Sequence, residues 1–141
     1  NVNTLGRNVM ALITWTAAQY GTNVGFADEE HKILFGKLNS LYDLATSGAA
    51  RTAIGAQLDD LIAYVVGHFA HEESEMKAKG YATFDAHKAE HVALVGICAD
   101  LQKKFHASEA EVTEEVGQLV KGWLDNHIPK FDMAYAGALN S

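Results

Sequence analysis

Apolar residues follow a helical period in four separate stretches of the chain. They recur every three or four positions over about 28–46, 52–79 and 84–106, and again from 108 to about 135. Such spacing places the apolar side chains on one face of an α-helix. No stretch of useful length alternates with the period of two that a strand would show. The pattern therefore predicts an all-α protein.

Start and stop signals divide these stretches into separate helices. Asp28 is expected to cap the first helix, and Ser108–Glu111 reads as a capping box for the fourth. Ser47–Gly48 and Gly80 are stop signals after the first and second helices. Helices joined by short loops pack as antiparallel neighbours. We expect an antiparallel up-down-up-down four-helix bundle, with an N-terminal arm that ends near residue 27.

Composition narrows the class of protein further. The chain has 141 residues, enough for one domain, and its formal net charge is −7 without any run of Lys or Arg. This charge argues against a nucleic-acid or anionic-membrane surface, and no apolar run approaches the roughly 18 residues that span a bilayer. The single cysteine, Cys98, forms no intrachain disulfide and is expected to be a small buried hydrophobe. Cysteine usage fits a cytoplasmic location.

Several polar residues lie on the apolar faces of the predicted helices. They are five histidines and one glutamate: His31, His68, Glu72, His87, His91 and His127. Each buried polar atom left without a partner costs about 1–3 kcal/mol, and a shared metal ion removes that cost for all of them. The pattern therefore predicts a metal site inside the bundle.

The segment HFAHEESEM at 68–76 contains two overlapping His-x-x-x-Glu pairs. Helical phase distinguishes them. His68 and Glu72 continue the apolar face, whereas His71 and Glu75 continue a more polar face. We therefore expect the first pair to point into the core and the second pair toward solvent. We expect the same exposure for the remaining histidine, His106.

His127 needs a partner, and the segment HIPKFD at 127–132 offers Asp132. In a regular α-helix, five positions separate the two side chains in angle. Pro129 removes a backbone donor within this turn, so a kink or a locally wider turn would swing Asp132 toward His127. A regular helix with Asp132 in solvent would contradict this hypothesis.

Four motifs occur in order along the chain: DEEHKILF at 28–35, HFAHEE at 68–73, HKAEH at 87–91 and HIPKFD at 127–132. Taken together, they resemble the hemerythrins, and specifically the single-domain bacterial members of that family. The resemblance extends from about Leu12 to Leu139. It places residues 10–141 in a hemerythrin-like oxygen-binding domain and leaves 1–9 as an added leader or a disordered N-terminus.

The resemblance implies two non-haem iron ions with a bridging oxo or hydroxo group and dioxygen as the ligand. It assigns three histidines to one iron: His87, His91 and His127. It assigns His31 and His68 to the other iron, and it has Glu72 and Asp132 bridge the two irons. Ligand type alone would also allow zinc, copper or nickel, so the assignment to iron comes from the resemblance.

Counting these ligands leaves one position of two six-coordinate irons open, on the iron with two histidines. Dioxygen is expected to bind there. The apolar pocket around it is expected to include four residues that are also ordinary core positions: Phe35, Phe69, Trp123 and Ile128.

The predicted function is reversible dioxygen binding by a monomer, for storage, transport or delivery to an oxygen-consuming enzyme. The chain is expected not to be an enzyme, because no Glu-x-x-His pair of the ferritin-like di-iron proteins occurs in it. Three alternatives remain open on the sequence: an oxygen or redox sensor acting through a separate partner, iron storage, and nitric oxide binding.

Overall fold

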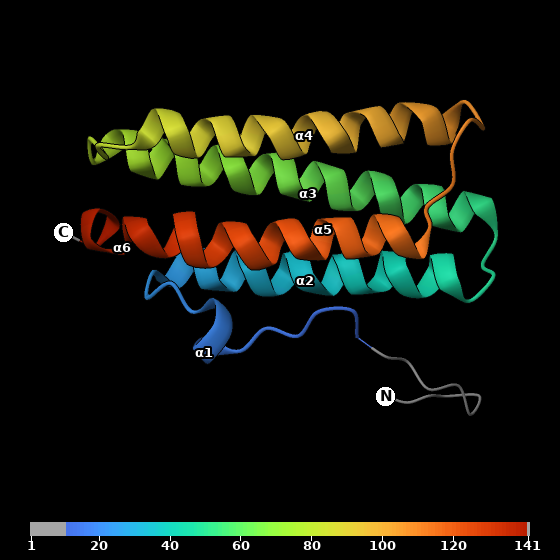
Figure 1. Ribbon diagram of the computed structural model, residues 1–141, viewed down its shortest axis with the longest axis horizontal. Coiled ribbons are helices and arrows are strands. Elements are labelled where there is room, and N and C mark those ends of the chain that lie inside the picture. The colour runs from blue at the N-terminus through green and yellow to red at the C-terminus, as the bar shows by residue number, and fades with distance from the viewer. Residues whose placement is uncertain (1–10, 141) are drawn as a thin grey trace.

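Four long helices run side by side in the computed structural model, which describes residues 11–140 (Figure 1). The helices, with the short elements at each end, are α1 (Ala17–Tyr20), α2 (Gly25–Thr46), α3 (Arg51–Ala78), α4 (Phe84–His106), α5 (Glu114–His127), a π-helical turn (Ile128–Asp132), a 3-10 turn (Met133–Tyr135) and α6 (Ala136–Leu139). The described part of the chain contains no strand. Successive long helices run in opposite directions, which confirms the predicted bundle.

The bundle is held by the apolar faces that the sequence pattern predicted. Leu34, Leu38 and Leu41 of α2 belong to one buried apolar cluster with leucines of the neighbouring helices, and each is at most 3% exposed. Full burial of one such side chain stabilises the fold by about 1.5–3 kcal/mol. No helix in the described region is long and apolar enough to cross a membrane.

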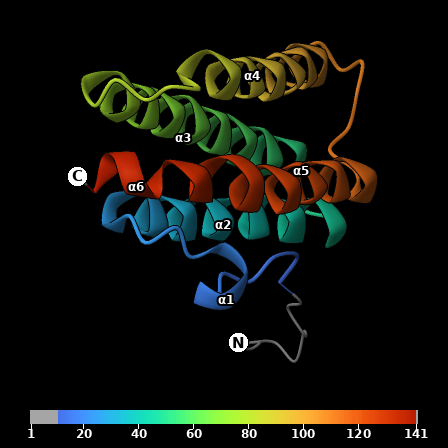
Figure 2. The same cartoon turned by 60° about the vertical axis from the view of Figure 1, so that its left-hand side comes forward.

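The N-terminal arm lies on the outside of α2, away from α4 (Figure 2). The backbone of Ile13 exchanges two hydrogen bonds with the side-chain amide of Asn39, at 3.0 and 2.8 Å. The Tyr20 hydroxyl donates to Asp125 Oδ1 at 2.5 Å, and its ring meets Phe35 edge-on. The arm is therefore packed on the bundle as expected. The expectation for residues 1–9 lies outside the described residues.

The expected cap at Asp28 is wrong. The helix α2 begins at Gly25, one turn earlier, after Val24. Asp28 instead accepts hydrogen bonds from the backbone N–H and the hydroxyl of Thr22, at 2.9 and 2.8 Å. A carboxylate in the first turn of a helix also interacts favourably with the helix dipole. The role of Asp28 is to hold the loop that precedes α2.

The expected capping box at Ser108 is also wrong. Thr113 caps α5, because its hydroxyl accepts from the backbone N–H of Val116. Ser108 has a φ of 61° and donates its N–H to the carbonyl of Phe105, so it closes the end of α4. Glu111 pairs with Arg51 instead of a helix start.

Two glycines on α5 differ in the space around them. A Cβ added to Gly122 would meet nothing within 4 Å, whereas one added to Gly117 would lie 2.6 Å from the ring of Tyr42. We predict that Gly122→Ala raises the free energy of unfolding by about 0.5–1 kcal/mol, through helix propensity. Gly117→Ala should lower it by about 1–3 kcal/mol, through overpacking. Urea titrations would measure both, and equal effects would contradict the packing at Tyr42.

Candidate metal centre

Seven polar side chains meet inside the bundle, each at most 3% exposed. They come from all four long helices and from the π-helical turn after α5: His31 of α2, His68 and Glu72 of α3, His87 and His91 of α4, His127 of α5 and Asp132 of the turn. The pairs on α3 and α4 are four residues apart, so each pair lies on one helix face. As helical phase predicted, His68 and Glu72 point inward.

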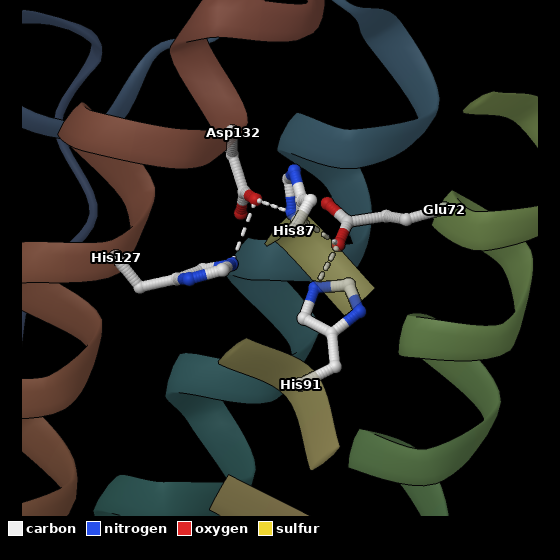
Figure 3. Close-up of side chains that lie close together, drawn as sticks. All are labelled: Glu72, His87, His91, His127 and Asp132. Atoms are coloured by element: carbon white, nitrogen blue, oxygen red, sulfur yellow. Dashed lines mark ion pairs between the residues drawn. The ribbon is translucent and has the colours of Figure 1, made fainter. Parts of the chain in front are cut away.

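Three of the histidines and both carboxylates form one group (Figure 3). Nε2 of His87 and Nε2 of His127 both lie 2.9 Å from Asp132 Oδ1. Nε2 of His91 lies 3.2 Å from Glu72 Oε1. One ligand atom from each of the five residues lies within 4.8 Å of all the others.

The other two histidines form a second group with the same two carboxylates. Nε2 of His31 lies 3.0 Å from Asp132 Oδ2, and Nε2 of His68 lies 3.3 Å from Glu72 Oε2. Each carboxylate therefore turns one oxygen toward the first group and the other oxygen toward the second. This is the arrangement in which a carboxylate bridges two metal ions.

The turn after α5 brings Asp132 into the centre. Residues 128–132 form a π-helix, with Pro129 in its first turn. A π-helix closes its hydrogen bonds over five residues, so a side chain five positions after His127 returns to the same face. Asp132 is 1% exposed. The predicted wider turn is thus confirmed.

Three residues outside the cluster hydrogen-bond to it, and sequence analysis missed these contacts. Glu30 Oε1 lies 2.7 Å from Nδ1 of His68, and Glu73 Oε2 lies 2.8 Å from Nδ1 of His91. A carboxylate there accepts from Nδ1–H and leaves the Nε2 lone pair facing the cluster. The Tyr135 hydroxyl donates to Glu72 at 2.5 Å. Each contact joins different elements, so no local spacing announces it.

The two histidines expected at the surface are exposed, yet neither is without a partner. His71 is 42% exposed, stacks near Phe26 and lies 2.6 Å from the second oxygen of Glu30. His106 is 50% exposed and lies 2.8 Å from Asp59. His71 therefore belongs to the surroundings of the cluster, through Glu30, and not to the cluster itself.

The charged side chains of the cluster shift one another's pKa values. Burial and the neighbouring Glu72 would raise the pKa of Asp132, but the nitrogens of His127, His31 and His87, at 2.9–3.0 Å, outweigh them and hold it below its usual range. Burial would lower the pKa of His68, but Glu72 and Glu30 raise it to about 10. The buried carboxylates thus need positive charge close to them. A metal cation would supply that charge.

A metal also fits because inward-facing atoms lack other partners. Buried atoms without a hydrogen-bond partner among the described residues include Nε2 of His68, His87, His91 and His127, Glu72 Oε1 and Asp132 Oδ1. Each such atom costs about 1–3 kcal/mol when it stays unsatisfied. Imidazole nitrogens and carboxylate oxygens together suit first-row transition metals, including iron.

The residues expected to line an apolar pocket lie around this cluster. Phe69 stacks on the ring of His91 with a centroid distance of 3.8 Å, and Trp123 stacks on His127 at 4.2 Å. Both rings therefore cover the three-histidine group. Phe35 is buried one helical turn after His31, on the two-histidine side. Ile128 is fully buried next to His127 in the chain.

Comparison with known proteins identifies the family. The family model of the hemerythrin HHE cation binding domain matches residues 22–139. The chain belongs to the hemerythrin family. It is 61% identical over 132 residues to the bacteriohemerythrin of Methylococcus capsulatus, covering 94% of this chain and all of that protein. The myohemerythrin of Theromyzon tessulatum is 35% identical, with 79% of this chain and 82% of that protein covered.

Solved structures agree with this membership. A crystal structure of wild-type hemerythrin matches with a TM-score of 0.90 and 60% identity, covering 93% of this chain and all of that one. A crystal structure of a hemerythrin point mutant matches with a TM-score of 0.91 and the same identity, covering 94% of this chain and all of that one. As a hemerythrin, the chain binds dioxygen at a non-haem di-iron centre, and the buried cluster offers nitrogen and oxygen donors for it.

Removing the Tyr135 hydroxyl tests how strongly the surroundings hold Glu72. We predict that Tyr135→Phe lowers the free energy of unfolding by about 1.5–3 kcal/mol, because a buried carboxylate loses its donor. Denaturant titration would measure this. Tyr81→Phe is the control, since no described residue hydrogen-bonds the Tyr81 hydroxyl, and an equal loss in both variants would contradict the role of the Tyr135 contact.

Proposed function

We propose that the chain is a reversible dioxygen carrier whose seven buried side chains are the iron ligands. His87, His91 and His127 hold one iron, and His31 and His68 hold the other. Glu72 and Asp132 bridge the pair. This assignment rests on the orientation of the two carboxylates, because each of them presents one oxygen to each histidine group.

The unequal histidine count directs dioxygen to one side of the centre. When bound, the iron pair supplies two electrons and one open coordination position for dioxygen. The chain contributes the surroundings on the two-histidine side. Phe35 is 2% exposed and is covered in turn by Tyr20 of the arm, which hydrogen-bonds to Asp125. These contacts exclude bulk water and so slow the oxidation that would end reversible binding.

The surroundings of the ligands favour binding over catalysis. Outer carboxylates fix the orientation of His68 and His91, and Tyr135 fixes Glu72. A centre with a histidine-rich, orientationally fixed ligand set suits a ligand that binds and leaves unchanged. We further propose that the carrier supplies an oxygen-consuming enzyme in the cytoplasm.

The surface supports a monomer. Exposed large apolar side chains occur on all four long helices of the described region, and two of them, Val66 and Val92, line one groove between α3 and α4. A stable interface between subunits usually buries about 800 Å² on each partner, more than this one groove offers.

Reversibility can be measured directly. We predict that the anaerobically reduced, iron-loaded protein gains a visible charge-transfer band when air is admitted, and that the band fades when the solution is purged with inert gas. Repeated cycles should restore most of the band, as monitored by absorption spectroscopy. Immediate conversion to a fully oxidised spectrum that purging does not reverse would overturn the carrier and favour a sensor or an enzyme.

The ligand assignment can be tested with two histidines of one helix. We predict that His68→Ala loses iron during dialysis against a chelator far faster than His71→Ala. His68 Nε2 faces the cluster, whereas His71 reaches it only through Glu30. Iron content by metal analysis is the readout. Equal retention in the two variants would show that His68 is not a ligand.

A further inference from the structure

An apolar cavity lies in the bundle between the second halves of α2 and α4 and the first halves of α3 and α5. This is the end of the bundle at which α4 connects to α5 (Figure 1). All four long helices contribute to its wall, including Leu38, Leu58 and Cys98. The part of the cavity that the centre of a water-sized sphere can occupy has a volume of about 30 Å³. About 10–15 Å³ on this measure holds one water molecule, so the cavity has room for a small diatomic molecule.

The wall of this cavity is apolar throughout. No polar atom contributes to its exposed surface, although Thr113 and Tyr42 are among its lining residues. A buried water molecule needs two to four polar partners, and apolar cavities without them stay dry and take up apolar gases. The thiol of Cys98 fits this character, because burial raises its pKa to about 11 and keeps it uncharged.

The cavity stands in a fixed relation to the metal centre. On each of the four helices, a residue of its wall lies seven positions from a histidine of the cluster. On α2 these two residues are Leu38 and His31, and on α4 they are Cys98 and His91. Seven residues of α-helix rise by about 10 Å, so the cavity and the cluster are stacked along the bundle axis.

One layer of apolar side chains separates the two sites. It consists of one buried residue from each helix, Leu34, Val65, Leu94 and Leu124, each 2–4% exposed. These residues carry no hydrogen-bonding side-chain atom. Side chains in a core change rotamer from time to time, and such changes would let a small apolar molecule pass this layer.

We propose that this cavity is an internal docking site for dioxygen, one side-chain layer from the di-iron centre. The lining residues Thr113, which is exposed, and Val116, which is half-buried, mark where dioxygen can enter from the surface. A gas molecule held there has only this side-chain layer to cross before it binds the centre, or after it is released from it. The role of this site in dioxygen carriage rests on the proposed function, whereas the existence of a gas site does not.

Xenon tests the gas site without any oxygen chemistry. Crystals of the iron-loaded, oxidised protein are pressurised with xenon and their diffraction is recorded. We expect xenon density between Leu58, Leu61 and Cys98. Ordered water in the cavity, or xenon only elsewhere, would overturn the proposal. This result is independent of reversible dioxygen binding, so a failure of the carrier function is seen separately in the air-and-purge cycle.

Two substitutions at one position then test the route. Cys98→Leu adds carbon to the cavity and should abolish the xenon density, whereas Cys98→Ala should keep it. In stopped-flow mixing of the reduced proteins with dioxygen, we expect Cys98→Leu to show a severalfold slower association than Cys98→Ala. Equal association rates in the two variants would overturn the docking role, even with xenon bound in the wild-type protein.

Discussion

The cost of placing five imidazoles and two carboxylates in an apolar core shapes the rest of this structure. Isolated, each such group would be destabilising, because burial penalises both charge and unmet hydrogen bonds. Here every group is near an opposite charge, and the shared carboxylates connect the two histidine groups. The helices are therefore bound to one another at this level by polar contacts, with apolar packing above and below.

The sequence alone predicted the fold and the inward-facing residues, because both depend on the helical period. The choice between His68 and His71 needed only the phase of one helix. The approach of Asp132 to His127 needed the spacing of five and the presence of Pro129. All three inferences concern residues close together in the chain, where the geometry of a single helix decides the outcome.

The sequence pattern could not predict the contacts between different helices and turns. Glu30 directly precedes His31, yet its carboxylate serves His68 and His71 on another helix. Asp28 and Ser108 both resembled helix starts, but a short polar side chain near a helix end can cap the helix, close a loop or end the preceding helix equally well. Which of these occurs depends on the neighbouring backbone, which a single sequence does not specify.

The π-helical turn has a consequence for the end of the chain. In α-helical register each residue advances the helix by about 100°, so relaxing this turn would rotate everything after it. Asp132 and the buried Tyr135 would then leave the core together. The helical register of this turn therefore determines whether Asp132 lies in the centre. The same turn that places Asp132 in the centre therefore also sets the position of the C-terminal segment, from which Tyr135 donates a hydrogen bond to Glu72.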